Sequence, residues 1–322
     1  MLRIATLGTL RNNIAAQSRF WDFDWMHIDA DQPTADGRPH EVDVLLSMIY
    51  RQADTKKVTF RLLHALGAGL DKIEFDVLPA DATVCNMFGH EIPMAEYCVS
   101  AILNAAIDWR GMTEAFRTKS WGAAYHSRVR RPELAGKTVG IIGMGHIGTE
   151  VAKRLAGFDV RILGIASKAR AAPAGVAWVR GPEAVGDLVA EADFIVLSAA
   201  LTEDTRNIVD AAAIGRMKPN AYIINVGRGG LIEEAPFYEA LRSGRILGAT
   251  LDTWYNYPTG AEDTIAPASL PFADLPNVVP TPHSSAWTAE LADRRHRFLA
   301  DNLRNFIAGR PLMNVVHAPA GG

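Results

Sequence analysis

Two side chains suited to acid–base and anion chemistry follow short apolar runs in the second half of the chain. His283 follows the run 278–281 in "VVPTPHSS", and Arg228 follows the run 222–226 in "YIINVGRGG". Imidazole exchanges a proton near neutral pH, and a guanidinium binds two oxygen atoms at once. These residue types predict a site that binds a carbonyl or carboxylate and transfers a proton. A structural histidine and a surface ion pair are the alternatives.

A glycine motif precedes both residues. Gly143, Gly145 and Gly148 form G-x-G-x-x-G in "TVGIIGMGHIG", directly before a helical pattern in which Val151 and Leu155 share a face. In a dinucleotide-binding turn, the first glycine permits the tight bend, the second lets the backbone approach a pyrophosphate, and the third packs helix on strand. A turn with no ligand is the alternative. The predicted cofactor-binding residues of this turn are Gly143, Met144, Gly145, His146, Ile147 and Gly148.

Short apolar runs alternate with segments of helical period around this motif. This alternation predicts an α/β fold, with a Rossmann-like, doubly wound parallel sheet covered by helices on both faces. We place this dinucleotide-binding domain at residues 100–285. Its expected strands are 138–143, 160–165, 194–197, 222–226, 249–252 and 278–281.

Both ends of the chain contribute to a second, smaller α/β domain. Apolar runs at 3–7, 42–47 and 62–66 predict its strands, and helical patterns at 94–116 and after His283 predict the crossings between domains. We therefore predict a discontinuous substrate-binding domain formed by residues 1–99 and 286–322. The glycine motif is central in the chain because this domain surrounds it in sequence.

Composition excludes several other classes of protein. The chain has 322 residues, 48% of them hydrophobic, and a formal net charge of -3, which disfavours nucleic acid and acidic membranes as partners. Its apolar runs are shorter than the ~20 residues that a membrane helix needs. Cys85 and Cys98 are too few for a disulfide framework or a cysteine-based metal site. We expect a cytoplasmic protein without a metal.

Four segments together resemble the D-isomer-specific 2-hydroxyacid dehydrogenases. They are "LLHALGAGLDKIE", "GKTVGIIGMGHIG", "INVGRGGLIEE" and "NVVPTPHSSAWT", in the order and spacing of that family. The resemblance implies an NAD(P)-dependent oxidoreductase with a flavodoxin-like substrate domain, a Rossmann-like cofactor domain and a site in the cleft. It also implies a homodimer formed through the cofactor domain. The implied reaction is hydride transfer between NAD(P)H and a small 2-oxo acid, as in glyoxylate or hydroxypyruvate reduction.

The resemblance also implies roles for individual residues. His283 is the predicted acid/base, and Arg228 the predicted cation that binds and polarises the substrate. Asp252, which ends the run "GATLD", resembles the residue that fixes the nicotinamide carboxamide; a helix cap or a solvated loop acid is its alternative. The expected binding site for the substrate carboxylate is the backbone N–H groups of Ala68, Gly69 and Leu70.

One departure from the family pattern concerns the partner of His283. An acidic residue usually precedes a proline in the segment after Asp252, but "LDTWYNYPTG" places Tyr257 before Pro258. A tyrosine with an ordinary pKa is neutral near pH 7 and supplies no charge to the imidazole. We predict Tyr257 as a catalytic neighbour of His283, with Glu262 or Asp263 as alternative sources of a carboxylate.

The second departure concerns the adenosine ribose. An NAD site typically has Asp or Glu about 20 residues past the glycines, whereas this chain has Ser167, Lys168 and Arg170 in "ASKAR". Cations and a hydroxyl in place of a carboxylate favour the 2′-phosphate of NADP. NADP is therefore the predicted cofactor, with NAD as the alternative. A polar turn without cofactor contact is the alternative explanation of these residues.

The sequence leaves the substrate and two other functions open. The same fold serves relatives that act on other small anions, such as formate or phosphite, and corepressor-like proteins that sense a dinucleotide with little turnover. The segment 47–52, "SMIYRQ", with Trp254, Tyr255 and Trp287, predicts either an aromatic-lined substrate pocket or ordinary core and interface aromatics.

Overall fold

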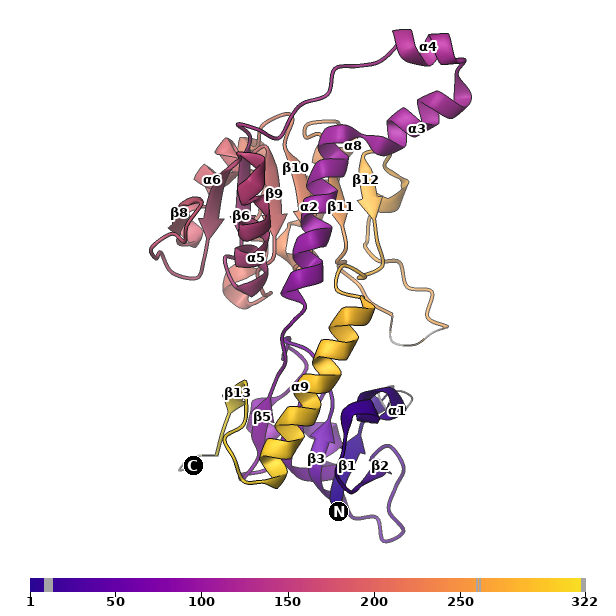
Figure 1. Cartoon of the computed structure of the whole chain (residues 1–322), viewed down its shortest axis with the longest axis vertical. Helices are drawn as coiled ribbons and strands as arrows, with labels where there is room; N and C mark the ends of the chain where they lie inside the picture. The colour runs from indigo at the N-terminus through magenta and orange to yellow at the C-terminus, as the bar shows by residue number, and fades with distance from the viewer. Residues whose placement is uncertain (9–13, 259, 261, 320–322) are drawn as a thin grey trace. The chain divides into compact units, whose positions relative to one another are not determined.

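The computed structural model describes residues 1–8, 14–258, 260 and 262–319. The chain divides into two compact units (Figure 1). Unit 1 comprises Met1–Gly89 and Thr288–Gly322, and unit 2 comprises His90–Trp287. The boundaries expected from the sequence were 99/100 and 285/286. The assignment of substrate and cofactor to the two units stays a prediction.

Seven strands of the described residues form the parallel sheet of unit 2, in the order β12-β11-β10-β9-β6-β7-β8. Read from β8, this is the 3-2-1-4-5-6 order of the Rossmann fold with a seventh strand added. The predicted fold class is confirmed. The unpredicted strand is β8, a half-exposed edge strand. The strands are β6 (Thr138–Ile142), β7 (Arg161–Ile165), β8 (Val176–Arg180), β9 (Phe194–Leu197), β10 (Tyr222–Asn225), β11 (Gly248–Leu251) and β12 (Val278–Pro280).

Helices cover both faces of this sheet because adjacent strand residues point to opposite sides. Ile141 packs in a core cluster with residues of α2 (Glu91–Ile107) and α5 (His146–Leu155). Ile142 packs with residues of the helices on the other face. Those helices are α6 (Val185–Glu191), α7 (Ala211–Arg216) and α8 (Glu234–Arg242).

The expected helix 94–116 is interrupted at Asp108. This residue has a left-handed backbone, with φ of 54°, and ends α2. Its carboxylate then accepts a hydrogen bond from the Gly111 N–H (3.0 Å) and caps the next helix, α3 (Trp109–Thr118). The short helix α4 (Trp121–His126) follows. An unbroken apolar pattern concealed this break, which one side chain produces.

Unit 1 contains a mixed sheet in the order β13-β5-β4-β3-β1-β2. The parallel strands have the flavodoxin-like order 2-1-3-4-5, and β13 pairs antiparallel with β5. The helix α9 (Ala289–Ile307) packs Leu299 and Leu303 against one face of this sheet. The helix α1 (Ile14–Gln17) is a single turn. The strands are β1 (Leu2–Thr6), β2 (Trp25–Asp29), β3 (His40–Leu46), β4 (Val58–His64), β5 (Thr83–Cys85) and β13 (Val315–His317).

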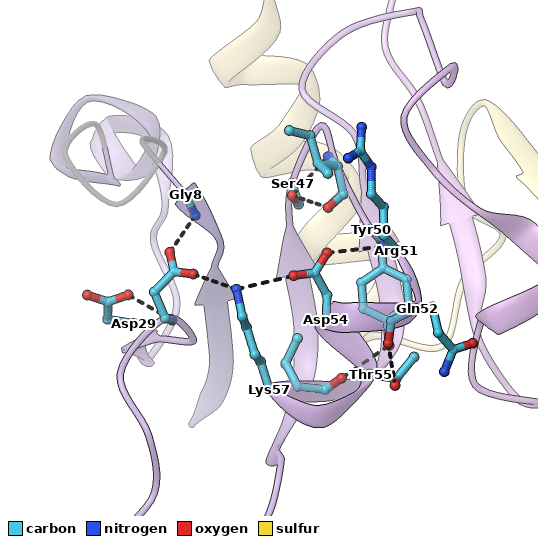
Figure 2. A network of polar contacts seen from close by, with 12 residues as sticks. Gly8, Asp29, Ser47, Tyr50, Arg51, Gln52, Asp54, Thr55 and Lys57 are labelled. Carbon is cyan, nitrogen blue, oxygen red and sulfur yellow. Dashed lines mark hydrogen bonds and ion pairs between the residues drawn. The ribbon is translucent and has the colours of Figure 1, made fainter. Parts of the chain in front are cut away.

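A polar network fixes the connection between β3 and β4 (Figure 2). The Lys57 ammonium lies 3.1 Å from Asp31 Oδ1 and 3.3 Å from Asp54 Oδ1. Asp31 also accepts from the Gly8 N–H (2.6 Å). Tyr50, from "SMIYRQ", is buried and donates its hydroxyl proton to the Val58 carbonyl (3.2 Å). Tyr50 is therefore a core residue of unit 1.

His64 ends β4 in a fully buried polar cluster. Its Nδ1 lies 3.1 Å from the Ala65 carbonyl, so Nδ1 carries the proton, and Nε2 accepts from the Asn302 amide (3.0 Å). Asn302 also bonds both backbone groups of Met313, at 2.8 and 3.1 Å. The neutral imidazole thus joins β4, α9 and the segment before β13.

This cluster predicts acid sensitivity of unit 1. Burial lowers the pKa of His64 from 6.5 to about 4, and the hydrogen bond to Ala65 opposes this change. The unfolded chain therefore binds a proton at a higher pH than the folded chain. The contribution of His64 to the unfolding free energy is fully present above the pKa of the unfolded state and is lost as the pH falls below that value. We expect His64 to remove about 2 kcal/mol of unfolding free energy between about pH 7.5 and about pH 5.

Denaturant unfolding of the wild type and His64→Gln at both pH values measures this contribution. The pH dependence of the unfolding free energy should be smaller in His64→Gln by about that amount. Equal pH dependence in the two proteins would show that His64 does not titrate as its burial requires.

Candidate functional site

The glycine turn after β6 divides into two packed positions and one open position. Gly143 has φ of 110°, and a Cβ there would lie 2.4 Å from the Ala199 nitrogen. A Cβ on Gly148 would lie 2.3 Å from the Gly143 carbonyl oxygen. Gly145 is the N-cap of α5, and a Cβ on it would meet no described atom within 4 Å. The backbone at Gly145 is thus open to a ligand at a helix N-terminus, where anions bind favourably.

The rest of the turn presents backbone and side chain differently. Met144 is buried in the core, and its N–H donates to the Ile165 carbonyl (2.8 Å), so its side chain and its N–H are both engaged within the protein. His146 is exposed, and Ile147 is partly buried.

Polar residues after β7 lie beside the same turn. Ser167, Lys168 and Arg170 are exposed, and the Arg170 guanidinium donates to the Met144 carbonyl. The Arg170 charge therefore lies next to the glycine motif. Arg180, at the end of β8, lies beside this segment, since its carbonyl accepts from the Ala166 N–H (2.9 Å), while its guanidinium stacks on Trp178.

Arg228 is partly buried in a loop that two close contacts shape. A Cβ on Gly229 would lie 2.4 Å from the Trp254 carbonyl carbon, so the loop approaches the backbone after β11 closely. Asn225, also missed from the sequence, accepts from the Gly227 N–H (3.1 Å) and donates to the Arg228 carbonyl (3.0 Å). Asn225 closes the turn that presents the guanidinium.

His283 follows β12 with a strained backbone and an aromatic neighbour. Its φ of 55° lies in the left-handed region, which costs a residue other than glycine about 1–3 kcal/mol. Its ring centroid lies 5.5 Å from that of Tyr257. The Tyr257 hydroxyl accepts from the Trp254 N–H (3.2 Å), and burial raises the Tyr257 pKa, so the phenol is neutral near pH 7.

Asp252, directly after β11, holds the segment that carries His283. It is fully buried, and its carboxylate accepts from the Thr281 hydroxyl (2.6 Å) and from the N–H groups of Ser284 (2.8 Å) and Ser285 (2.9 Å). Burial acts to raise the Asp252 pKa, but hydrogen bonds from Ser285, Thr281 and Ser284 outweigh it, and the net pKa is lowered. Asp252 is a buried carboxylate anion beside the histidine.

The charges around His283 oppose one another. Partial desolvation lowers the His283 pKa below its ordinary value, the Asp252 carboxylate acts to raise it, and the Arg228 guanidinium acts to lower it. Asp263, one alternative source of a carboxylate, accepts from the Ile265 N–H (2.9 Å), and Glu262 is exposed. In the described part of the chain, the negative charge that acts on His283 comes from Asp252.

The predicted substrate loop of unit 1 presents unpaired backbone N–H groups. Among the described residues, the N–H groups of Ala68, Gly69 and Leu70 donate to no protein acceptor. The carbonyls around them accept hydrogen bonds within unit 1. Such a run of amides binds anions. The occupying donors are His64 Nδ1 to Ala65 (3.1 Å), the Met87 N–H to Gly67 (3.1 Å), Asn86 Nδ2 to Ala68 (3.1 Å) and the Ile73 N–H to Leu70 (3.0 Å).

Most of the aromatic side chains considered for a pocket belong to the core. Trp254 is buried, and its Nε1 donates to the Thr281 carbonyl (2.9 Å). Tyr255 packs against the same core, and its hydroxyl donates to the Ile232 carbonyl (3.0 Å). Trp287 is 87% exposed. The alternative of ordinary core aromatics therefore holds for Trp254 and Tyr255, as it does for Tyr50.

Two other kinds of feature are absent from the described residues. None of the helices there has the length and apolar character needed to cross a membrane. Groups of three or more His, Cys, Asp or Glu side chains arranged to hold a metal ion are also absent from that part of the chain.

Comparison with known proteins gives a family match. Residues 99–285 match the family model described as "D-isomer specific 2-hydroxyacid dehydrogenase, NAD binding domain". The chain is 32% identical over 288 residues to a D-3-phosphoglycerate dehydrogenase from Methanocaldococcus jannaschii, with 87% of this chain and 52% of that protein covered. It therefore spans about half the length of that relative.

Two further similarities extend over most of both chains. A hydroxypyruvate reductase from Thermotoga maritima is 35% identical over 266 residues, with 79% of this chain and 81% of that protein covered. A D-isomer specific 2-hydroxyacid dehydrogenase from Xanthobacter autotrophicus Py2, solved in complex with NADPH and MES, has a TM-score of 0.77 and 26% identity. That comparison covers 98% of each chain.

The close approach at Gly229 predicts a specific cost for an added methyl group. In Gly229→Ala, the new Cβ would overlap the Trp254 backbone, so we expect the unfolding free energy to fall by about 1–3 kcal/mol. In the control Gly230→Ala, the nearest atom is the flexible end of Leu201 at 3.2 Å, so the loss should be smaller. Denaturant unfolding compares them, and equal losses would contradict the packing of this loop.

Proposed function

Because the chain belongs to the D-isomer specific 2-hydroxyacid dehydrogenase family, we propose that it reduces a small 2-oxo acid to the D-2-hydroxy acid with NAD(P)H. One observation carries this proposal. Arg228, Asp252 and His283 follow β10, β11 and β12, three adjacent parallel strands, at their carboxyl ends. Ligands of doubly wound folds bind at this edge of the sheet.

Each group has a defined task in reduction. A bound nicotinamide supplies the hydride. The Arg228 guanidinium binds the substrate oxygens and stabilises the negative charge that develops on the carbonyl oxygen. His283, in its protonated form, donates a proton to that oxygen. Tyr257 lies against the imidazole and limits its movement. In unit 1, the N–H groups of Ala68, Gly69 and Leu70 are the proposed donors to the substrate carboxylate.

The proposed cofactor of unit 2 is NADP, with NAD as the alternative. The open backbone at Gly145 and the N-terminus of α5 suit the pyrophosphate. Ser167, Lys168 and Arg170 offer one hydroxyl and two cations for a 2′-phosphate, and residues 166–170 contain no carboxylate that would repel it. Asp252 is the proposed acceptor for the carboxamide: protein donors occupy three of the about four acceptor positions of its carboxylate, although the side chain is fully buried in the absence of a ligand.

The proposed assembly is a homodimer formed through unit 2. The helix α3 exposes Trp109 (61%), Met112 (45%) and Phe116 (58%) at helical spacing, which gives a contiguous apolar stripe. A stripe of this kind marks an interface.

Light scattering on a sizing column tests the proposed dimer. The wild type should give twice the chain mass, and Phe116→Glu should give a lower mass. A monomeric wild type would contradict the proposal.

Turnover with both reduced cofactors tests the proposed reaction. We expect oxidation of NADPH by glyoxylate, hydroxypyruvate or a related 2-oxo acid, with a kcat/KM at least about tenfold higher than with NADH. A clear preference for NADH would exclude the role proposed for Lys168 and Arg170. Dinucleotide binding without turnover of any 2-oxo acid would instead support a dinucleotide-sensing protein.

The neutral neighbour of His283 gives a pH prediction. Reduction needs the imidazolium, so activity is present below the His283 pKa and is lost above it. In Tyr257→Glu, a carboxylate next to the ring should raise that pKa. The alkaline limb of the reduction rate should therefore move to higher pH than in the wild type. Tyr257→Gln is the neutral control.

Both variants must be folded and must bind NADPH before their profiles are compared. An alkaline limb that stays in place or moves to lower pH in Tyr257→Glu would argue against His283 as the proton donor or against Tyr257 as its neighbour.

A further inference from the structure

A chain of hydrogen bonds leads from α2 to the histidine segment of unit 2. The Tyr97 hydroxyl oxygen lies 2.7 Å from Thr281 Oγ1, which lies 2.6 Å from Asp252 Oδ1. The low pKa of Asp252 makes its carboxylate an acceptor only, so the single Thr281 hydroxyl proton points to Asp252. Tyr97 must then donate to Thr281. Burial raises the Tyr97 pKa to about 12, so its hydroxyl retains the proton that this requires.

Hydrogen bonds of Thr281 and Asp252 fix the backbone on both sides of His283. Before it, the Thr281 N–H donates to the Leu251 carbonyl (2.9 Å), and the Thr281 carbonyl accepts from Trp254 Nε1 (2.9 Å). After it, the N–H groups of Ser284 and Ser285 donate to Asp252. His283 has a left-handed backbone, which is unfavourable for a histidine. The hydrogen bonds on both sides of the residue must therefore hold it in this conformation.

We propose that Tyr97 is a positioning residue for His283, acting through Thr281 and Asp252. By fixing the direction of the Thr281 hydroxyl, Tyr97 keeps Asp252 oriented toward the Ser284 and Ser285 amides. The bonds from these amides to Asp252 hold the backbone that carries the imidazole. This inference rests on the proposed role of His283 in reduction. Tyr97 does not enter the reaction itself.

Unit 2 also contains a matched control. The Tyr222 hydroxyl lies 2.9 Å from Thr250 Oγ1, so it too is a buried tyrosine paired with a threonine. Burial raises its pKa, as in Tyr97. Within the described residues, no side-chain hydrogen bond joins Thr250 to the segment 281–285. Tyr222→Phe therefore removes a comparable buried bond that is not part of the Tyr97–Thr281–Asp252 chain.

Steady-state kinetics separates positioning from packing. Tyr97→Phe should lower kcat about fivefold or more, with KM for the 2-oxo acid and Kd for NADPH within about twofold. Tyr222→Phe should leave all three nearly unchanged. Thr281→Val should lower kcat at least as much as Tyr97→Phe, and Thr281→Ser, which keeps the hydroxyl, should restore it. Because Tyr97 acts through Thr281, adding Tyr97→Phe to Thr281→Val should cause no further loss.

Amide hydrogen exchange gives a readout that needs no turnover. Exchange at Ser284 and Ser285 should be faster in Tyr97→Phe than in the wild type and unchanged in Tyr222→Phe. If the wild type reduces no 2-oxo acid, the proposed function fails, and exchange still decides whether Tyr97 holds this segment. Equal kcat in Tyr97→Phe and the wild type, additive losses in the double variant, or unchanged exchange would each overturn the inference.

Discussion

The buried carboxylate of Asp252 is the constraint on which the candidate site depends. A carboxylate anion removed from water is costly unless hydrogen bonds compensate it. Thr281, Ser284 and Ser285 supply these hydrogen bonds to Asp252. The buried charge is therefore stabilised only when the segment around His283 folds against Asp252. The bonds that stabilise the charge are the same bonds that place the histidine, and the charge also acts on the histidine pKa.

The sheet explains why this arrangement also includes Arg228. Parallel strands that lie side by side end at one edge, so residues after β10, β11 and β12 meet although they are far apart in sequence. Gly229 then permits the arginine loop to approach the backbone after β11. Backbone geometry therefore brings the Arg228 guanidinium and the His283 imidazole, the proposed substrate-binding cation and proton donor, to one edge of the sheet.

Much of this architecture could be predicted from the sequence because its signals are local. Apolar runs bounded by glycine or polar residues identified six of the seven described strands of unit 2, and "GMGHIG" identified the turn after β6. The short strands β2, β5, β8 and β13 were missed because three to five residues, most of them partly exposed, carry no clear period. The break at Asp108 was missed because it depends on one side-chain hydrogen bond.

The roles of polar residues were harder to predict because they depend on contacts across the fold. Asp252 was expected to serve the cofactor, and its bonds to Thr281, Ser284 and Ser285 bring together positions 29 or more residues apart. Asn225 and Tyr97 carry no motif of their own. From the sequence, the departure at Tyr257 left Glu262 and Asp263 as the alternative sources of a carboxylate near His283, whereas Asp252, which follows another strand, supplies that charge.

Asp252 both holds the segment that carries His283 and supplies negative charge near its imidazole. The most direct test is an NMR titration of the His283 imidazole in the wild type and in Asp252→Asn, with folding verified for both. Removing the carboxylate charge should lower the His283 pKa below its wild-type value, because that charge stabilises the imidazolium. An unchanged or higher His283 pKa in Asp252→Asn would contradict the account.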